Sequence, residues 1–248
     1  MRLAPLAALL LLLVALAPAA HAARPLLGAV IVVDPGHNRG NASNPQSQRP
    51  VDYGAGSKPC DATGTSTNDG YPEYAFTWDV SRRVAAILRA RGARVILTRG
   101  ATTPAWGPCI TERAAIGNRA RADAAISIHG DGGPPGVSGF FTIATATPIP
   151  QIGKTAAMIA ADVELAAAVR DAYGRSTGMR VSPTYGGTGI YRSNDYGGTN
   201  LSRVPKIFIE CGNMRNAGDA ARLRDARFRG RAAAGIAAGL ERFVLARR

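Results

Sequence analysis

Beyond its N-terminal leader, the chain of 248 residues lacks any apolar run long enough to cross a membrane. It also lacks internal repeats and any sign of a second domain. These absences predict one folded domain with no stable membrane insertion. The chain is long enough to bury one substantial core.

Residues 1–22 are predicted to be a secretory signal peptide, and residues 23–248 the folded domain. Arg2 stands near the start, residues 6–16 are apolar, and Ala20-His21-Ala22 forms a small-x-small cleavage site. The apolar run is shorter than the ~20 residues of a membrane-spanning helix. No cysteine stands at the cleavage point, which argues against a lipid anchor. We therefore expect a protein secreted to the periplasm or the cell wall.

Acidic residues are scarce: 17 Asp and Glu stand against 30 Lys and Arg, and the formal net charge is +13. Such a charge favours polyanionic partners. Because the leader predicts export, we expect an anionic cell-envelope polymer as partner and no nucleic acid. The arginines are scattered along the chain, so an arginine-rich coding bias without any binding role explains the charge equally well.

Cysteine is also rare, with three residues in the chain. Cys60 and Cys109 both lie in segments rich in proline and glycine, and an exported protein can form disulfides. A bridge between these two is our hypothesis. Cys211 lies on an apolar run and is expected to be a buried free thiol.

Three apolar runs each lead to a polar residue with catalytic potential. Ile-Val-Val-Asp-Pro-Gly precedes His37, Ala-Ala-Ile-Ser-Ile precedes His129, and Lys-Ile-Phe-Ile precedes Glu210. Continuous apolar runs are typical of buried parallel strands. Open α/β sheets place their ligand sites at the carboxyl ends of such strands. His37 and His129 are the only histidines outside the leader.

Strands and helices alternate along the rest of the chain. We predict further strands over residues 94–99 and 139–144, and helices over residues 73–91, 111–121, 152–173 and 219–245, the last broken near 228–230. Two polar, glycine-rich segments separate these elements. Residues 38–71 should hang over the first strand's carboxyl end, and residues 174–202 should cover the site or hold a short hairpin. The alternation predicts an α/β sheet covered on both faces.

Two histidines at strand ends favour a metal site with one carboxylate ligand. Catalytic zinc commonly has three protein ligands of these types and one open position, although iron or manganese could use the same set. The carboxylate candidates near strand ends or helix starts are Asp34, Glu73, Asp131 and Glu210. A role in complementing the helix dipole would by itself explain Glu73. Glu210, on the most apolar strand, is our candidate for the catalytic acid and base.

The ordered motifs resemble those of the zinc-dependent N-acetylmuramoyl-L-alanine amidases of the type 3 amidase family. They are Val-Asp-Pro-Gly-His at 33–37, Glu73 at a helix start, Ser-Ile-His-Gly-Asp at 127–131 and Ile-Glu-Cys-Gly-Asn-Met at 209–214. The combination covers nearly the whole chain after the leader. The segment Gly-Thr-Ser-Thr-Asn at 64–68 is similar to that of the compact mycobacterial and actinobacterial members.

The resemblance implies that His37, Glu73 and His129 bind zinc and that Glu210 is the catalytic residue. It further implies a peptidoglycan hydrolase that cleaves the amide between N-acetylmuramic acid and L-alanine, in peptidoglycan or in muropeptide fragments. Separately from the resemblance, we expect a monomer. The implied fold is a single α/β domain with a mixed, mostly parallel sheet of about six strands flanked by helices. A Cys60–Cys109 bridge agrees with the compact members.

Departures from the family motifs leave the groove and its selectivity open. After the first histidine the family often has Gly-Gly, where this chain has Asn38-Arg39-Gly40. The alternatives are a zinc peptidase or deacetylase acting on another envelope amide, and a non-catalytic, basic wall-binding protein.

Overall fold

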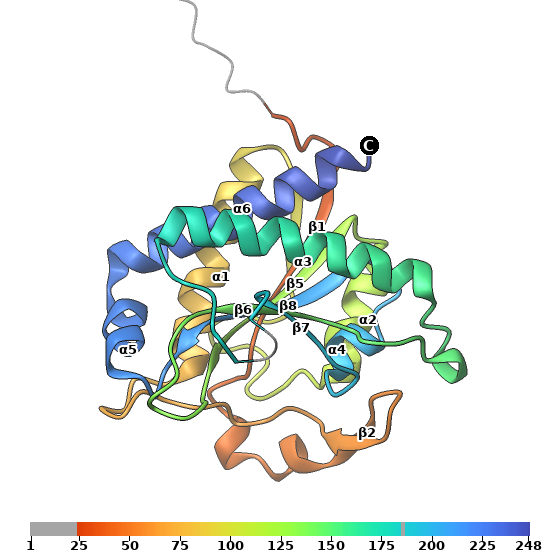
Figure 1. The fold of residues 1–248 in the computed structure, drawn as a ribbon. Coiled ribbons are helices and arrows are strands. Elements are labelled where there is room, and N and C mark those ends of the chain that lie inside the picture. Colours follow the sequence, from red (N-terminus) through yellow and green to blue (C-terminus); the bar gives the residue numbers. More distant parts are fainter. Residues whose placement is uncertain (1–23, 185–186) are drawn as a thin grey trace, which may run out of the picture.

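The computed structural model describes residues 24–184 and 187–248 (Figure 1). The predicted signal peptide lies outside the described residues. Among the described residues, no helix has the length and apolar character needed to span a membrane.

A six-stranded sheet with the order β4-β1-β5-β8-β6-β7 forms the centre of the domain. Its strands are β1 (Val30–Pro35), β4 (Arg94–Leu97), β5 (Ala124–Asp131), β6 (Phe141–Ala144), β7 (Ile190–Arg192) and β8 (Lys206–Asn213). The first four in the order, β4, β1, β5 and β8, run parallel, whereas β6 is antiparallel to β8 and β7 runs parallel to β6. The predicted mixed, mostly parallel sheet is confirmed.

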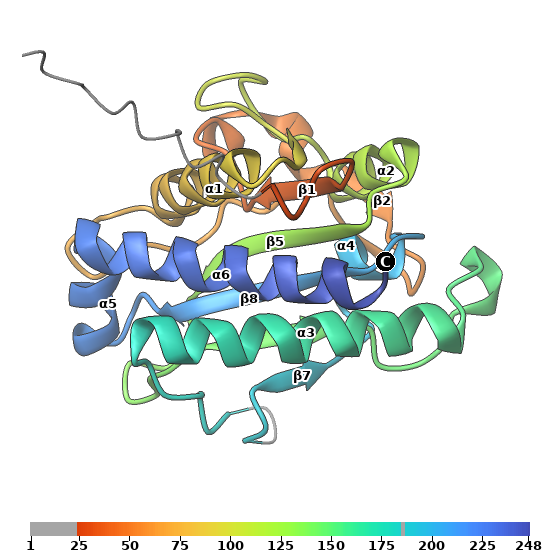
Figure 2. The same ribbon diagram turned by 90° about the horizontal axis from the view of Figure 1, so that it is seen from above.

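Helices cover both faces of this sheet. They are α1 (Glu73–Ala90), α2 (Ile110–Ala120), α3 (Ala156–Thr177), α4 (Gly197–Asn200), α5 (Ala217–Arg224) and α6 (Ala226–Ala246). Figure 2 shows α3 and α6 lying side by side along the sheet, and α6 also packs against α1. The helix α2 packs on the opposite face.

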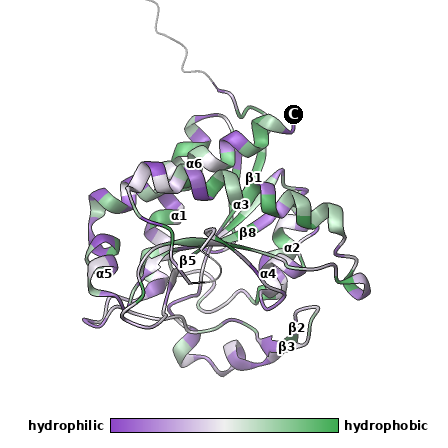
Figure 3. Cartoon of the chain, viewed as in Figure 1, coloured by the Kyte–Doolittle hydropathy of each residue, from purple (hydrophilic) through white to green (hydrophobic). Residues whose placement is uncertain are grey.

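Alternation along the strands sends side chains to two different cores. Ile31 and Val33 of β1 point into the large core beneath α1, α3 and α6, while Val32 belongs to a small core beneath α2. Figure 3 shows apolar residues concentrated in the sheet, whereas the segment around β2 (Pro50–Asp52) and β3 (Ser57–Pro59) is largely hydrophilic. The fold therefore has one heavily covered face and one face with room for a site.

Two helix boundaries differ from the sequence prediction because capping side chains set them. The helix α3 begins after Thr155, whose hydroxyl accepts a hydrogen bond from the amide of Met158, and a 3-10 turn over Pro150–Ile152 precedes it. The position predicted for the helix break, near 228–230, is wrong. The break lies at Asp225, whose side chain caps α6.

The two glycine-rich segments hold more structure than predicted. Residues 38–71 contain two 3-10 helices, Asn41–Ser43 and Pro45–Gln48, and the hairpin of β2 and β3. In the described part of the second segment, β7 pairs with β6 in parallel and no hairpin forms, whereas residues 191 and 195–198 line the cavity over the strand ends, in agreement with the other alternative, that the segment covers the site. The short helix α4 follows β7.

A disulfide joins Cys60 to Cys109, with an S–S distance of 2.07 Å. It ties the end of the β2–β3 hairpin to the residue before α2. Cys211 is buried and free. Both cysteine predictions are therefore confirmed.

Candidate metal centre

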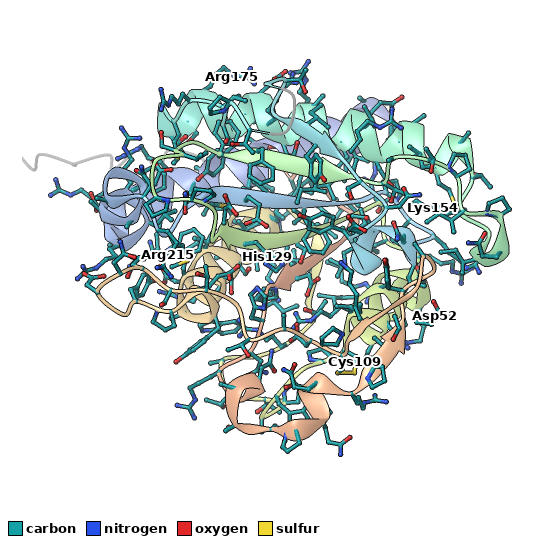
Figure 4. The ribbon with its side chains drawn as sticks, turned by 60° about the horizontal axis from the view of Figure 1, so that its bottom comes forward. Asp52, Cys109, His129, Lys154, Arg175 and Arg215 are labelled. Carbon is teal, nitrogen blue, oxygen red and sulfur yellow. A yellow bond between two sulfur atoms is a disulfide. The ribbon has the colours of Figure 1, made fainter. Side chains whose placement is uncertain are left out.

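The candidate site occupies the lightly covered face of the sheet, near the carboxyl ends of three parallel strands. Strand register pairs Asp34 with Ser127, Ser127 with Phe208, and His129 with Glu210. Side chains two positions apart on a strand share a face, so Ser127 and His129 point the same way, as do Phe208 and Glu210. Figure 4 shows His129 projecting from β5 toward the layer that holds Cys109.

His37 follows β1 in a left-handed backbone conformation, with φ of 57°. Its Nδ1–H donates to the carbonyl of Ala62 at 2.8 Å, which leaves Nε2 to face the site. The guanidinium of Arg113 donates to the carbonyl of His37 at 3.2 Å. These two contacts fix the ring and compensate for the uncommon backbone conformation.

Glu73 is the first residue of α1 and is buried. Its carboxylate accepts hydrogen bonds from the backbone amides of Thr65 at 2.9 Å and Gly130 at 3.1 Å. The same carboxylate lies 3.1 Å from Nε2 of His37 and 3.0 Å from Nδ1 of His129. Glu73 therefore lies at the helix start, where the helix dipole favours a carboxylate, and also lies between the two imidazoles.

His129 is oriented by a chain of hydrogen bonds that leads away from the site. Its Nε2–H donates to the hydroxyl of Ser127 at 3.1 Å, and that hydroxyl donates to the carboxylate of Asp34 at 2.9 Å. With Nε2 engaged in this way, a metal ion between His129 and Glu73 would take the lone pair of Nδ1.

Asp34 lines the cavity, but its carboxylate pairs with buried cations and is not one of the three clustered donors. Its carboxylate pairs with Arg113 at 2.7 Å and with Lys206 at 3.1 Å, and accepts a hydrogen bond from Thr98 at 2.5 Å. Although burial raises the pKa of Asp34, these two cations outweigh it and hold that pKa well below its usual range. Of the carboxylate candidates, Glu73 therefore joins the two histidines, and Asp34 does not.

Glu210 lines the cavity beside His129, and its Oε2 is buried without a hydrogen-bond partner among the described residues. Burial, with the negative charges of Glu73 and Asp131, raises the pKa of Glu210 well above its usual value. Asp131, the fourth candidate, follows a register shift in β5 and also lines the cavity. One uncommitted buried carboxylate oxygen beside the histidines is what a general base requires.

The pKa values of the clustered groups reflect their mutual charges. Burial lowers the pKa of His37, but the carboxylate of Glu73 outweighs it and raises that pKa to about 9. Burial raises the pKa of Glu73, and the charge of His37 brings it well below its usual range. For His129, burial and the charge of His37 lower the pKa. Glu73 therefore carries its negative charge between two imidazoles.

The cavity over the cluster has a volume of about 690 Å³. The ring of Phe208 stacks on His129 with centroids 5.0 Å apart, and Tyr196 packs edge-on against Phe208. Gly64 closes another side, where an added Cβ would meet the His37 ring at 2.8 Å and Glu73 Oε2 at 2.9 Å. A side chain larger than glycine is excluded there.

The donor set fits a zinc ion. One ligand atom each from His37, Glu73 and His129 lie within 4.8 Å of one another, and no other such group of three His, Cys, Asp or Glu occurs in the part of the chain described. Both imidazoles have their second nitrogen engaged, as is usual for metal ligands. Two histidines and one glutamate are a common ligand set of catalytic zinc.

Comparison with known proteins agrees with this geometry. The family described as N-acetylmuramoyl-L-alanine amidase matches residues 31–242. The chain belongs to this family. It is 38% identical over 219 residues to an N-acetylmuramoyl-L-alanine amidase of Mycobacterium tuberculosis, and the match covers 88% of each chain.

Solved structures of this family superpose on the chain. The amidase of Mycobacterium smegmatis has a TM-score of 0.81 and 38% identity, over 88% of this chain and 98% of that one. The apo form of the Mycobacterium abscessus enzyme has a TM-score of 0.79 and 34% identity, over 88% and 99%. The single α/β domain is thus the fold of these amidases.

Sequence reasoning missed Ser127, Arg113 and the positioning role of Asp34. Ser127 could have been found, because it stands two positions before His129 on one strand and so shares its face. Arg113 gave no such signal, since it lies on α2 and reaches His37 only in the folded chain.

Proposed function

We propose that this chain is a zinc-dependent peptidoglycan hydrolase that cleaves the amide between N-acetylmuramic acid and L-alanine. The family assignment supports the reaction. The observation that carries the zinc mechanism is the convergence of His37, Glu73 and His129 beside Glu210. His37 Nε2, the Glu73 carboxylate and His129 Nδ1 would hold the ion.

Bound zinc would polarise the scissile carbonyl, acidify a water molecule and offset the negative charge around Glu210. Glu210 takes the proton from the attacking water as the new C–O bond forms. It then gives that proton to the L-alanine nitrogen as the C–N bond breaks, so the products are a lactyl carboxylate and a free amine. The partner-free Oε2 of Glu210 supports this assignment.

Residues next to the three donors hold the two histidines in this geometry. Ser127 and Asp34 hold the His129 tautomer, and Arg113 holds the turn at His37. The ring of Phe208 covers one side of His129 and limits the access of bulk water. We further propose that the enzyme is exported by its predicted signal peptide and works as a monomer in the periplasm or cell wall.

Product analysis tests this function. Purified peptidoglycan digested by the wild-type protein should yield free N-terminal L-alanine on the stem peptide and a free lactyl carboxyl on the sugar. Cleavage at another amide, or at an acetamido group, would instead indicate a zinc peptidase or deacetylase. An absence of any product, together with tight binding to the wall, would favour the non-catalytic wall-binding alternative.

A further inference from the structure

A second cavity, of about 360 Å³, opens beside the metal centre. Gly64 and Thr65 line both this cavity and the larger one. Gly64 lies directly against His37 and Glu73, since a side chain there would collide with both. The second cavity therefore begins beside the bond that the proposed reaction cleaves.

The charges of the two cavities differ. Arg39 and Arg215 line the second cavity, and its lining contains no Asp or Glu. The lining of the larger cavity includes several acids, among them Asp131, Asp195 and Glu210. An anionic group of the substrate would thus be attracted into the second cavity, whereas the larger one, which Lys58 and Arg113 also line, carries charges of both signs.

Arg39 and Arg215 are both exposed. Neither guanidinium forms an ion pair with a residue that the structure describes. Two guanidinium groups at one cavity, with no carboxylate of the protein to neutralise them, leave their charge available to a ligand.

The backbone around these arginines is held in place. Arg215 follows β8, and its amide donates to Asn213 Oδ1 at 2.8 Å while its carbonyl accepts a hydrogen bond from Asn68 at 3.3 Å. Arg39 follows Asn38, whose amide group donates to the carbonyls of residues 104 and 107. These contacts hold the backbone at both positions, so each arginine is presented at the second cavity from a fixed segment: Arg39 two residues after His37, and Arg215 two residues after the end of β8.

The remaining lining supplies neutral hydrogen-bonding groups. They belong to Asn38, Thr63, Thr65, Ser66 and Tyr74. Hydroxyl and amide donors together with two guanidinium groups match the four lone-pair sites of a carboxylate. A peptide attached to L-alanine ends in such a carboxylate wherever its C-terminus is neither amidated nor cross-linked.

We propose that the second cavity binds a carboxylate of the peptide that follows L-alanine, with Arg39 and Arg215 as its cationic contacts. This inference rests on the proposed function. It gives the substrate a direction across the site: the peptide that leaves with the amine lies toward the two arginines, and the sugar lies toward Tyr196 and Phe208.

The test uses two synthetic substrates, an N-acetylmuramoyl-L-alanyl dipeptide with a C-terminal carboxylate and the same compound as its C-terminal carboxamide. Zinc-loaded wild-type protein is compared with Arg39→Gln and Arg215→Gln. The matched control is Arg175→Gln, because Arg175 is also exposed but lies on α3, away from His129 and Arg215 (Figure 4). Thermal melting establishes that each variant is folded.

For the carboxylate substrate we expect KM to rise about five- to tenfold in each cavity variant, with kcat changed less than about twofold. For the carboxamide, KM should stay at the wild-type value, and Arg175→Gln should match wild type on both. An equal rise in KM for both substrates, or no rise for either, would overturn the subsite while leaving the proposed function intact. If wild type cleaves neither compound, the subsite fails, whereas the proposed function fails only if purified peptidoglycan also yields no free N-terminal L-alanine.

Discussion

At the scale of single residues, zinc binding depends on which atoms face the common centre of the three donors. Ser127 is not among the three clustered donors, yet its hydroxyl lies 3.1 Å from Nε2 of His129 and can accept the proton of that nitrogen in a hydrogen bond. Because a ligand histidine with a free second nitrogen is less well oriented, Ser127→Ala should weaken zinc binding about 10- to 100-fold. Competition with a chromophoric chelator measures this affinity.

A matched control comes from Ser81 on α1, whose hydroxyl is also buried but has no hydrogen-bond partner in the described chain. Ser81→Ala should leave zinc affinity unchanged. Wild-type affinity in Ser127→Ala would remove the positioning role from that hydroxyl.

Glu210→Gln should separate catalysis from metal binding. The amide keeps the shape of the side chain but cannot carry a proton between water and amine, so turnover should fall at least about 100-fold. Zinc affinity should persist, since Glu210 is not among the three clustered donors. Thermal stability of the apoprotein should rise, because a buried carboxylate without a partner is costly. A variant that loses zinc along with activity would instead make Glu210 a ligand.

At the scale of elements, Asp34 joins three parts of the fold. It lies on β1 and pairs with Arg113 of α2 and Lys206 of β8. The pKa of Asp34 is depressed in the folded protein, so its stabilising contribution is complete above the unfolded value near 3.8 and is lost as pH falls below it. Below that pH the free energy of unfolding should decrease by about 1.4 kcal/mol per pH unit from this group alone.

Asp34→Asn tests that contribution. At pH 6 the variant should be about 3 kcal/mol less stable than wild type in urea unfolding, because two buried cations lose a partner. Between about pH 4 and pH 2.5 its stability should fall less steeply than that of wild type. Parallel curves for the two proteins would mean that Asp34 does not govern the acid sensitivity.

The strand ends could be predicted from the sequence because apolar runs before His37, His129 and Glu210 are local signals. The choice of Glu73 could not be made from spacing, since it lies 56 positions from His129 and meets it only after α1 packs on the sheet. Asp34 stood closer to His37 along the chain but points to buried cations instead. Only the resemblance to the amidases identified Glu73 in advance.

Element boundaries were predicted less well, because they depend on individual side-chain caps rather than on apolar periodicity. Thr155 starts α3 and Asp225 starts α6, while Gly230, at the predicted break, lies inside α6. The hairpin of β2 and β3 has three residues in each strand, too few for a periodic pattern.

At the scale of the whole molecule, the net charge of +13 has two explanations that salt can separate. If the basic surface attracts anionic wall polymer, cosedimentation of the Glu210→Gln protein with isolated wall should decrease as NaCl rises from about 50 to about 500 mM. Binding that does not change over this range would leave the charge as a coding bias without a binding role.

The central claim is that two imidazoles and one carboxylate, brought together by the fold, hold a single zinc ion beside Glu210. Anomalous diffraction from crystals of the zinc-loaded protein, recorded on both sides of the zinc absorption edge, tests it most directly. We expect one peak, bounded by His37 Nε2, the Glu73 carboxylate and His129 Nδ1. A peak elsewhere, or none at equimolar zinc, would contradict the claim.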